Sequence, residues 1–241
     1  MRVLYLHGFA SSPASSKAEY LAARLAPLGV ALERPDLNVP DFSTLTVTRM
    51  ISQVEDALGA DAACPVVLVG SSLGAFVAWH VAARAEAAGR PLDRLVLLAP
   101  ALDFGRRDLA LEPDEGLRRW RERGWWECDH HAYGERRRVH YALYGDASRH
   151  DTENAVVSAP ALVFQGRRDE VVRPEVVAAF AARRPTIELH LLDDDHQLAG
   201  SLETIWRETA RFLGLSVGVP RVGPGRGIRS PGEAPGAEGS A

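Results

Sequence analysis

The sequence predicts a single α/β domain, with a mostly parallel central sheet of about six strands and helices on both faces. Its 241 residues are enough for one sizeable domain and too few for two ordinary domains joined by a linker. Over roughly residues 1–215, short blocks of Val and Leu alternate with segments of helical periodicity. Blocks that are apolar throughout are typical of strands buried on both faces of a parallel sheet, and their alternation with helices indicates right-handed crossovers.

Six short apolar runs are the predicted strands. They are Val3–Leu6, Ala31–Leu32, Val66–Val69, Leu95–Ala99, Ala161–Phe164 and Ile187–Leu192. The last run is interrupted by Glu188 and His190, so one of its faces would be more exposed to solvent than the other. We therefore expect Ile187–Leu192 to be an edge strand.

Helices are predicted between these strands from apolar spacing and from end signals. The first would begin at a capping box formed by Ser16 and Glu19 and end at Gly29. The other predicted helices are Val47–Leu58, Ala75–Ala85, Glu175–Arg183 and Leu202–Phe212.

The sequence between Leu102 and Ala161 breaks this rhythm. A structureless loop of this length inside a domain would be unusual, and the segment is rich in aromatic and charged residues. We expect a short, mostly helical cap insertion over about residues 104–158, with a helical crossover on the back of the sheet as the alternative. Its tryptophans, Trp120, Trp125 and Trp126, are expected to roof a compact pocket, because three exposed indoles would be unfavourable.

The carboxyl-terminal segment has a different composition from the rest of the chain. Of the 25 residues from Val217 to Ala241, 11 are Gly or Pro. Such a segment buries too little apolar surface to offset the entropy of ordering it. We therefore expect an α/β domain over residues 1–215 and a disordered tail over residues 216–241.

Composition narrows the classes of protein to which the chain can belong. A net charge of −4 argues against nucleic acid as a partner. The two cysteines, Cys64 and Cys128, exclude a disulfide scaffold and a four-cysteine zinc site. No apolar run approaches the ~20 residues of a membrane span, and the first residues do not have the pattern of a secretory signal. A reduced, cytoplasmic location without membrane contact is expected.

The run Gly70–Gly74 (GSSLG) is the sharpest functional signal. It follows a predicted strand directly and opens a predicted helix, which is the context that gives a G-x-S-x-G pattern its meaning. A nucleophile at the tip of such a turn has a strained backbone, and glycines two residues away on either side prevent a clash. Ser72 has glycines at both offsets and Ser71 does not, so Ser72 is the predicted nucleophile.

A serine hydroxyl needs a neighbouring base, and the base needs an orienting acid. With a nucleophile on a strand–turn–helix elbow, the acid and then the histidine follow in the chain. His196 lies just beyond the last predicted strand, and Asp169 lies in the loop after the preceding strand. We therefore predict His196 as the base and Asp169 as the acid, with Glu170 as the rival for the acid.

The oxyanion formed during acyl transfer needs two backbone donors. One would be the amide of Leu73, which follows the nucleophile. The other would be the amide of Phe9 in the loop after the first strand, where Gly8 permits close approach. His7 lies in the same glycine turn, where a structural hydrogen-bonding role is expected of it.

These motifs, in this order, resemble those of the α/β-hydrolase superfamily. The amino-terminal block Tyr5–Pro13 (YLHGFASSP), followed by Ser16, Lys17 and Ala18, is similar to the YqiA/YcfP-type small bacterial esterases. The resemblance covers about residues 1–215. It implies an α/β-hydrolase fold with a reduced sheet.

The sequence therefore predicts a serine esterase or thioesterase of small soluble substrates, working through an acyl-enzyme. A carbon–carbon bond hydrolase or lyase with the same triad is the alternative, and a non-catalytic ligand-binding relative is a third hypothesis. No metal or cofactor is implied, because the His and acidic residues lack a metal-binding helical spacing.

Overall fold

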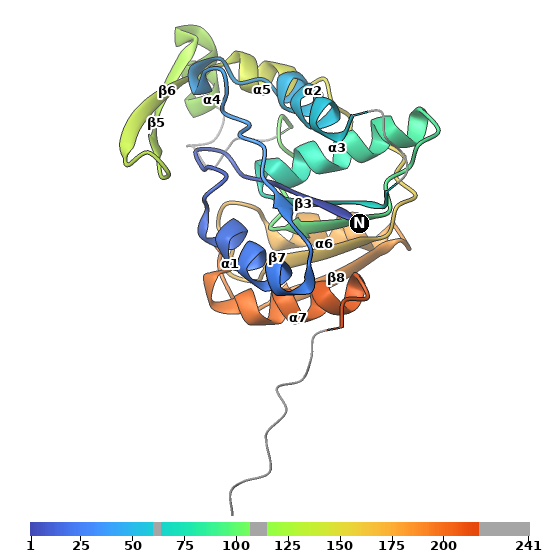
Figure 1. Ribbon diagram of the computed structural model, residues 1–241. Coiled ribbons are helices and arrows are strands. Elements are labelled where there is room, and N and C mark those ends of the chain that lie inside the picture. Colours follow the sequence, from blue (N-terminus) through green and yellow to red (C-terminus); the bar gives the residue numbers. More distant parts are fainter. Residues whose placement is uncertain (60–63, 107–114, 217–241) are drawn as a thin grey trace, which may run out of the picture.

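The computed structural model describes residues 1–59, 64–106 and 115–216 of the chain. These residues contain a six-stranded sheet in the order β2-β1-β3-β4-β7-β8, and every pairing in it is parallel (Figure 1). The strands are β1 (Arg2–Leu6), β2 (Leu32–Glu33), β3 (Val66–Ser71), β4 (Arg94–Leu98), β7 (Ala161–Gly166) and β8 (Ile187–Leu192). The predicted sheet is confirmed. The expected tail lies outside the described residues.

The apolar runs form strands because both faces of the sheet are covered. Along β3, Val67 and Val69 point into one apolar cluster, whereas Leu68 between them points into the other. The alternation follows from the two-residue period of a strand. The four central strands therefore need apolar side chains on both faces.

Helices cover the two faces of this sheet (Figure 1). One face is packed by α1 (Ser16–Leu25) and α7 (Leu202–Phe212). The other is packed by α2 (Val47–Leu58), α3 (Leu73–Ala87) and α6 (Pro174–Ala182). Short 3₁₀ turns η1 (Ala26–Leu28), η2 (Phe42–Thr44) and η3 (Ala199–Ser201) complete the connections.

The predicted capping box of α1 does not form. Ser15, not Ser16, occupies the N-cap position, and its side chain makes no capping hydrogen bond. The Glu19 carboxylate pairs instead with Arg34, beyond the edge strand β2.

The strand β8 lies at the edge of the sheet, as predicted from its mixed sequence. At the opposite edge β2 is only two residues long. No helix among the described residues is long and apolar enough to cross a membrane.

The insertion between β4 and β7 is less helical than expected. It contains α4 (Glu115–Arg123) and α5 (Ala142–Ala147), and between them an antiparallel hairpin of β5 (Trp125–His130) and β6 (Glu135–His140). The hairpin stands out from the body of the domain in Figure 1. Its buried side chains, Cys128 and His130 on β5 and Val139 on β6, leave the other positions to charged residues. Few apolar residues mark the two-residue period of these strands. The many charged residues around them are equally compatible with a helix.

Candidate active site

Ser72 lies at a strained turn between β3 and α3. Its φ of 53° and ψ of −115° place it in the left-handed half of backbone space, which is unusual for any residue other than glycine. A Cβ on Gly70 would lie 2.5 Å from the Cα of Ala75, and one on Gly74 would lie 2.1 Å from the carbonyl oxygen of Leu6. The two glycines therefore allow the turn to close against α3 and β1.

The turn places Ser72 beside His196 and Asp169. The Oγ of Ser72 is 3.1 Å from Nε2 of His196, and Nδ1 of the same ring is 2.9 Å from Oδ2 of Asp169. Because an ionised carboxylate can only accept, Nδ1 carries the ring proton and Nε2 accepts from the serine hydroxyl. The structure thus brings together the three side chains that the sequence singled out.

Asp169 lies in the loop between β7 and α6, and its side chain is fully buried. Burial alone would favour the neutral acid, but hydrogen bonds to the carboxylate outweigh it and hold the pKa of Asp169 below its usual range. The donors are the His196 ring, the amides of Val171 and Val172 and the side-chain amide of Gln165. Glu170, the rival acid, is exposed on the same loop.

The loop that carries His196 follows β8 and packs directly on the loop that carries Asp169. A Cβ on Gly166 would lie 2.5 Å from the carbonyl oxygen of Asp195, so only glycine permits this approach. The amide of Arg168 donates to the carbonyl of Asp194. Leu198 is completely buried just beyond the histidine. These contacts fix the backbone on both sides of His196.

The amides of Phe9 and Leu73 make no hydrogen bond to another described residue, so both are free to donate to a developing oxyanion. Gly8 lies against the nucleophile turn, where a Cβ would be 3.3 Å from the Cβ of Ser72. The loop is braced by buried His7. Its Nδ1 is 3.0 Å from the carbonyl of Gly8, and its Nε2 is 3.0 Å from the amide nitrogen of Leu37. Burial lowers the pKa of His7, in keeping with a neutral structural ring.

Aromatic rings from the insertion and from η2 cover the Phe9 side chain. The ring of Trp126 stacks on that of Phe9, and Phe42 lies 5.3 Å from Phe9 between ring centroids. Trp120 is buried behind them, with its indole nitrogen donating to the carbonyl of Val139. Trp126 was expected from the sequence to cover a pocket, whereas Phe42 was not identified, because its contact with Phe9 joins separate segments of the chain.

The three tryptophans that were expected to roof a compact pocket do line one hollow, but it lies away from the candidate nucleophile. Trp125 is 38% exposed and lies under the guanidinium of Arg138. Together with Gly116 and two arginines, the three indoles line a hollow of about 160 Å³ beside α4. Ser72 and His196 do not line that hollow.

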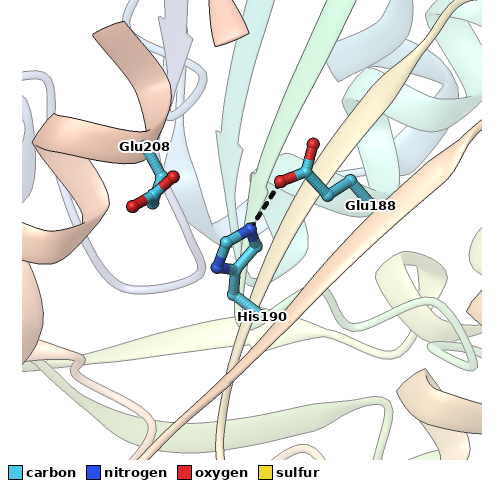
Figure 2. A group of neighbouring side chains, drawn as sticks. All are labelled: Glu188, His190 and Glu208. Atoms are coloured by element: carbon cyan, nitrogen blue, oxygen red, sulfur yellow. Dashed lines mark hydrogen bonds and ion pairs between the residues drawn. The ribbon is translucent and has the colours of Figure 1, made fainter. Parts of the chain in front are cut away.

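A second cluster of potential metal ligands lies away from Ser72, at the edge of the sheet. It consists of Glu188 and His190 from β8 and Glu208 from α7, whose ligand atoms lie within 4.8 Å of one another (Figure 2). Arg211 pairs with both glutamates, and Arg207 pairs with Glu208. Because these guanidinium groups already neutralise the carboxylates, the cluster is an ion-pair network that joins β8 to α7.

Comparisons with known proteins agree with this architecture. The sequence profile of a family described as "Uncharacterised protein family (UPF0227)" matches residues 2–213. No curated protein sequence matches the chain significantly.

Solved structures with the same fold are numerous, and three show its range. A putative hydrolase from Agrobacterium vitis S4 superposes with a TM-score of 0.74 at 23% identity, over 87% of both chains. Est1E from Butyrivibrio proteoclasticus, solved with ferulic acid bound, gives 0.72 at 21% identity, over 88% of this chain and 87% of that one. BorB, a type II thioesterase from the borrelidin biosynthetic cluster, superposes with a TM-score of 0.61 at 21% identity, over 89% of this chain and 91% of that one. The chain therefore has an α/β-hydrolase fold.

Proposed function

The chain belongs to the UPF0227 family, and from its α/β-hydrolase fold and the geometry at Ser72 we propose that it is a serine hydrolase of small carboxylic esters or thioesters. One observation carries the proposal: a serine on a strained elbow, a histidine and a buried carboxylate form a continuous hydrogen-bonded chain. A structural role would not require the strain at Ser72, which costs roughly 1–3 kcal/mol.

In the first half of the reaction, the Ser72 Oγ attacks the substrate carbonyl carbon while its proton passes to Nε2 of His196. Asp169 stabilises the imidazolium that forms and keeps its ring in place. The amides of Phe9 and Leu73 donate to the oxyanion of the tetrahedral intermediate. When the intermediate collapses, the bond to the leaving group breaks. His196 then gives its proton to the departing alcohol or thiol, which leaves an acyl-serine.

In the second half, water attacks the acyl-serine and His196 accepts its proton. The bond between the acyl group and Oγ breaks, the acid leaves, and the proton returns to Ser72. A thioester follows the same steps, because only the leaving group differs. Est1E, with ferulic acid bound, and the thioesterase BorB have the same fold, which supports ester and thioester substrates alike without choosing between them.

Covalent labelling tests the proposal without requiring a known substrate. A fluorophosphonate should add to the purified protein with one-to-one stoichiometry, and peptide mapping should place the adduct on Ser72. The Ser72→Ala variant should remain unlabelled while melting at the parent temperature. A panel of p-nitrophenyl esters and acyl thioesters then separates the two substrate classes. A label on Ser71, or undiminished ester turnover by Ser72→Ala, would overturn the assignment.

A further inference from the structure

Lys17 is a buried cation whose role the reaction above does not explain. It is the sole lysine among the 28 lysine and arginine residues of the chain. It lies in the first turn of α1 and is only 8% exposed. Everywhere else the chain uses arginine as its cation. The compact ammonium group of lysine differs in shape and hydrogen-bonding geometry from the planar guanidinium of arginine.

The location is unfavourable for a cation unless something nearby compensates it. The amino end of a helix carries a partial positive charge, which repels a lysine in the first turn. Burial lowers the pKa of the Lys17 ammonium, and the carboxylates of Asp195, Asp194 and Asp169 oppose that shift. The compensating groups thus belong to the two loops that carry His196 and Asp169.

One direct contact joins Lys17 to the histidine loop. Its Nζ donates to the backbone carbonyl of Gln197 at 2.8 Å, across 180 residues of sequence. Gln197 immediately follows His196, and its own amide donates to the carboxylate of Asp195. Besides the His196–Ser72 hydrogen bond and the packing of Leu198, the other contacts of this loop come from the Asp169 loop and from the loop itself. Lys17 is therefore the charged group of the amino-terminal half that holds the backbone next to His196.

The charges around this contact are otherwise balanced. Arg168, on the Asp169 loop, is paired with Asp193. Elsewhere on α1, Glu19 pairs with Arg34, and Arg24 pairs with Glu203 of α7. Lys17 is thus the cation that offsets the carboxylates of Asp169, Asp194 and Asp195, of which Asp169 contacts His196 directly.

We propose that Lys17 is a positioning residue for His196: it holds the histidine loop through the Gln197 carbonyl and offsets the three surrounding carboxylates. This inference rests on the proposed function, since it assigns Lys17 to the same site. It acts through His196 and makes no contact with the reacting atoms.

The test compares three variants with the parent protein. Lys17→Met removes both the hydrogen bond to Gln197 and the charge. Lys17→Arg keeps the positive charge but places it on a larger, planar group. Arg24→Met removes a cation of the same helix that is paired with Glu203. NMR of labelled imidazoles follows the titration of His196, and p-nitrophenyl butyrate hydrolysis gives kcat and KM across pH. Melting temperatures show whether each variant is folded.

In Lys17→Met, we expect kcat to fall by about tenfold or more with little change in KM, because the histidine is misplaced. The titration midpoint of His196, and with it the ascending limb of the pH–rate profile, should move to higher pH, since uncompensated carboxylates stabilise the imidazolium. Lys17→Arg should keep the parent midpoint and recover part of the lost kcat. Arg24→Met should match the parent in all three measurements.

An unchanged His196 midpoint in Lys17→Met would overturn the proposal, as would an equal shift in Lys17→Arg. A lower melting temperature with parental kcat and midpoint would make Lys17 purely structural. The NMR titration needs no turnover, so it decides the role of Lys17 even if no ester proves to be a substrate. Failure of the proposed function would instead appear as a Ser72→Ala variant whose ester turnover and fluorophosphonate labelling equal those of the parent.

Discussion

The indole of Trp126 lies parallel to the phenyl ring of Phe9, with ring centroids 5.8 Å apart and an interplanar angle of 8°. Phe9 carries one of the two proposed oxyanion donors, so the inserted hairpin is in direct contact with the oxyanion loop. The stack limits the conformations of that loop and supplies an apolar wall at its side. The insertion can therefore influence catalysis without contributing a residue to the triad.

Replacing Trp126 should impair turnover more than replacing its neighbour Trp125. We expect Trp126→Ala to lower kcat/KM for short acyl esters by roughly two- to tenfold, the equivalent of the ~0.5–1.5 kcal/mol that an aromatic stack contributes. Trp125→Ala is the matched control, because that ring is exposed and contacts Arg138 and His140 instead of the oxyanion loop. Equal losses in the two variants would show that only hairpin stability matters.

The hydrogen-bonded chain at Ser72 predicts a graded response to substitution. His196→Ala should lose as much activity as Ser72→Ala, on the order of 10⁴-fold, and the double variant should be no worse, because the two act as one unit. Asp169→Asn should cost less, at least about tenfold, because Asp169 orients the imidazole and stabilises its charge. Steady-state kinetics near neutral pH measure all four proteins.

Glu170→Gln is the control for the acid, since Glu170 adjoins Asp169 in sequence but is exposed. It should behave as the parent does. If it is impaired while Asp169→Asn remains active, the acid has been assigned to the wrong residue. The pH–rate profile of the parent should have an ascending limb, because a histidine base accepts the serine proton only when its ring is neutral.

The positions of the strands along the chain and the proximity of the three candidate site residues could be predicted because they depend on local signals. Val and Leu blocks identify the buried strands, and chain order then places the loops of Asp169 and His196 at the same sheet edge as Ser72. The hairpin could not be predicted in this way. Its buried positions are few, and the stretch around Arg136–Arg138 has too little apolar content to show a period.

Long-range contacts explain most of what the sequence did not reveal. The hydrogen bond from Lys17 to Gln197 and the stack of Trp126 on Phe9 join segments more than a hundred residues apart. No local pattern encodes such pairs. Composition did hold one clue: Lys17 is a lone lysine among arginines, which draws attention to its position.

The buried His80 should make the protein less stable in mild acid. Burial and the neighbouring His150 lower the pKa of His80 to about 4, against 6.5 for an unperturbed histidine. Between these two values the unfolded chain binds a proton at this ring that the folded chain does not. The free energy of unfolding is therefore unaffected by the titration of His80 above pH 6.5, and it decreases by on the order of 3 kcal/mol as the pH drops to about 4.

Urea unfolding of the parent and of His80→Gln, at several values between pH 4.5 and 7.5, measures this effect. The free energy of unfolding of the variant should depend less on pH than that of the parent. His131→Gln, which replaces an exposed histidine, should reproduce the slope of the parent. Parallel curves for the parent and His80→Gln would mean that His80 does not contribute to the pH dependence.

The surface of the hairpin predicts a preference for short acyl chains without activation at lipid surfaces. A lid that docks on lipid needs a broad apolar face. The exposed side chains of the hairpin are instead mostly charged: Glu127, Asp129, Arg136, Arg137 and Arg138. Among the apolar side chains of the insertion, Trp120 and Val139 are buried and Trp126 packs on Phe9. On the hairpin, two large apolar side chains, Trp125 and Tyr133, are exposed, which is too few for a broad apolar face that would hold a long chain.

Each methylene that fits adds only about 0.8 kcal/mol, whereas one that does not fit is excluded sterically. We expect acyl chains of roughly two to eight carbons to be preferred, since the apolar surface beside the oxyanion loop consists of a few rings, those of Phe9, Phe42 and Trp126. The measurement is the rate series from acetate to palmitate esters, below and above the solubility limit of each substrate. Hydrolysis of palmitate faster than that of butyrate, or a jump in rate once an emulsion forms, would refute this preference. Trp125→Ala should leave the series unchanged, whereas Trp126→Ala should flatten its dependence on chain length, because only the second ring borders the oxyanion loop.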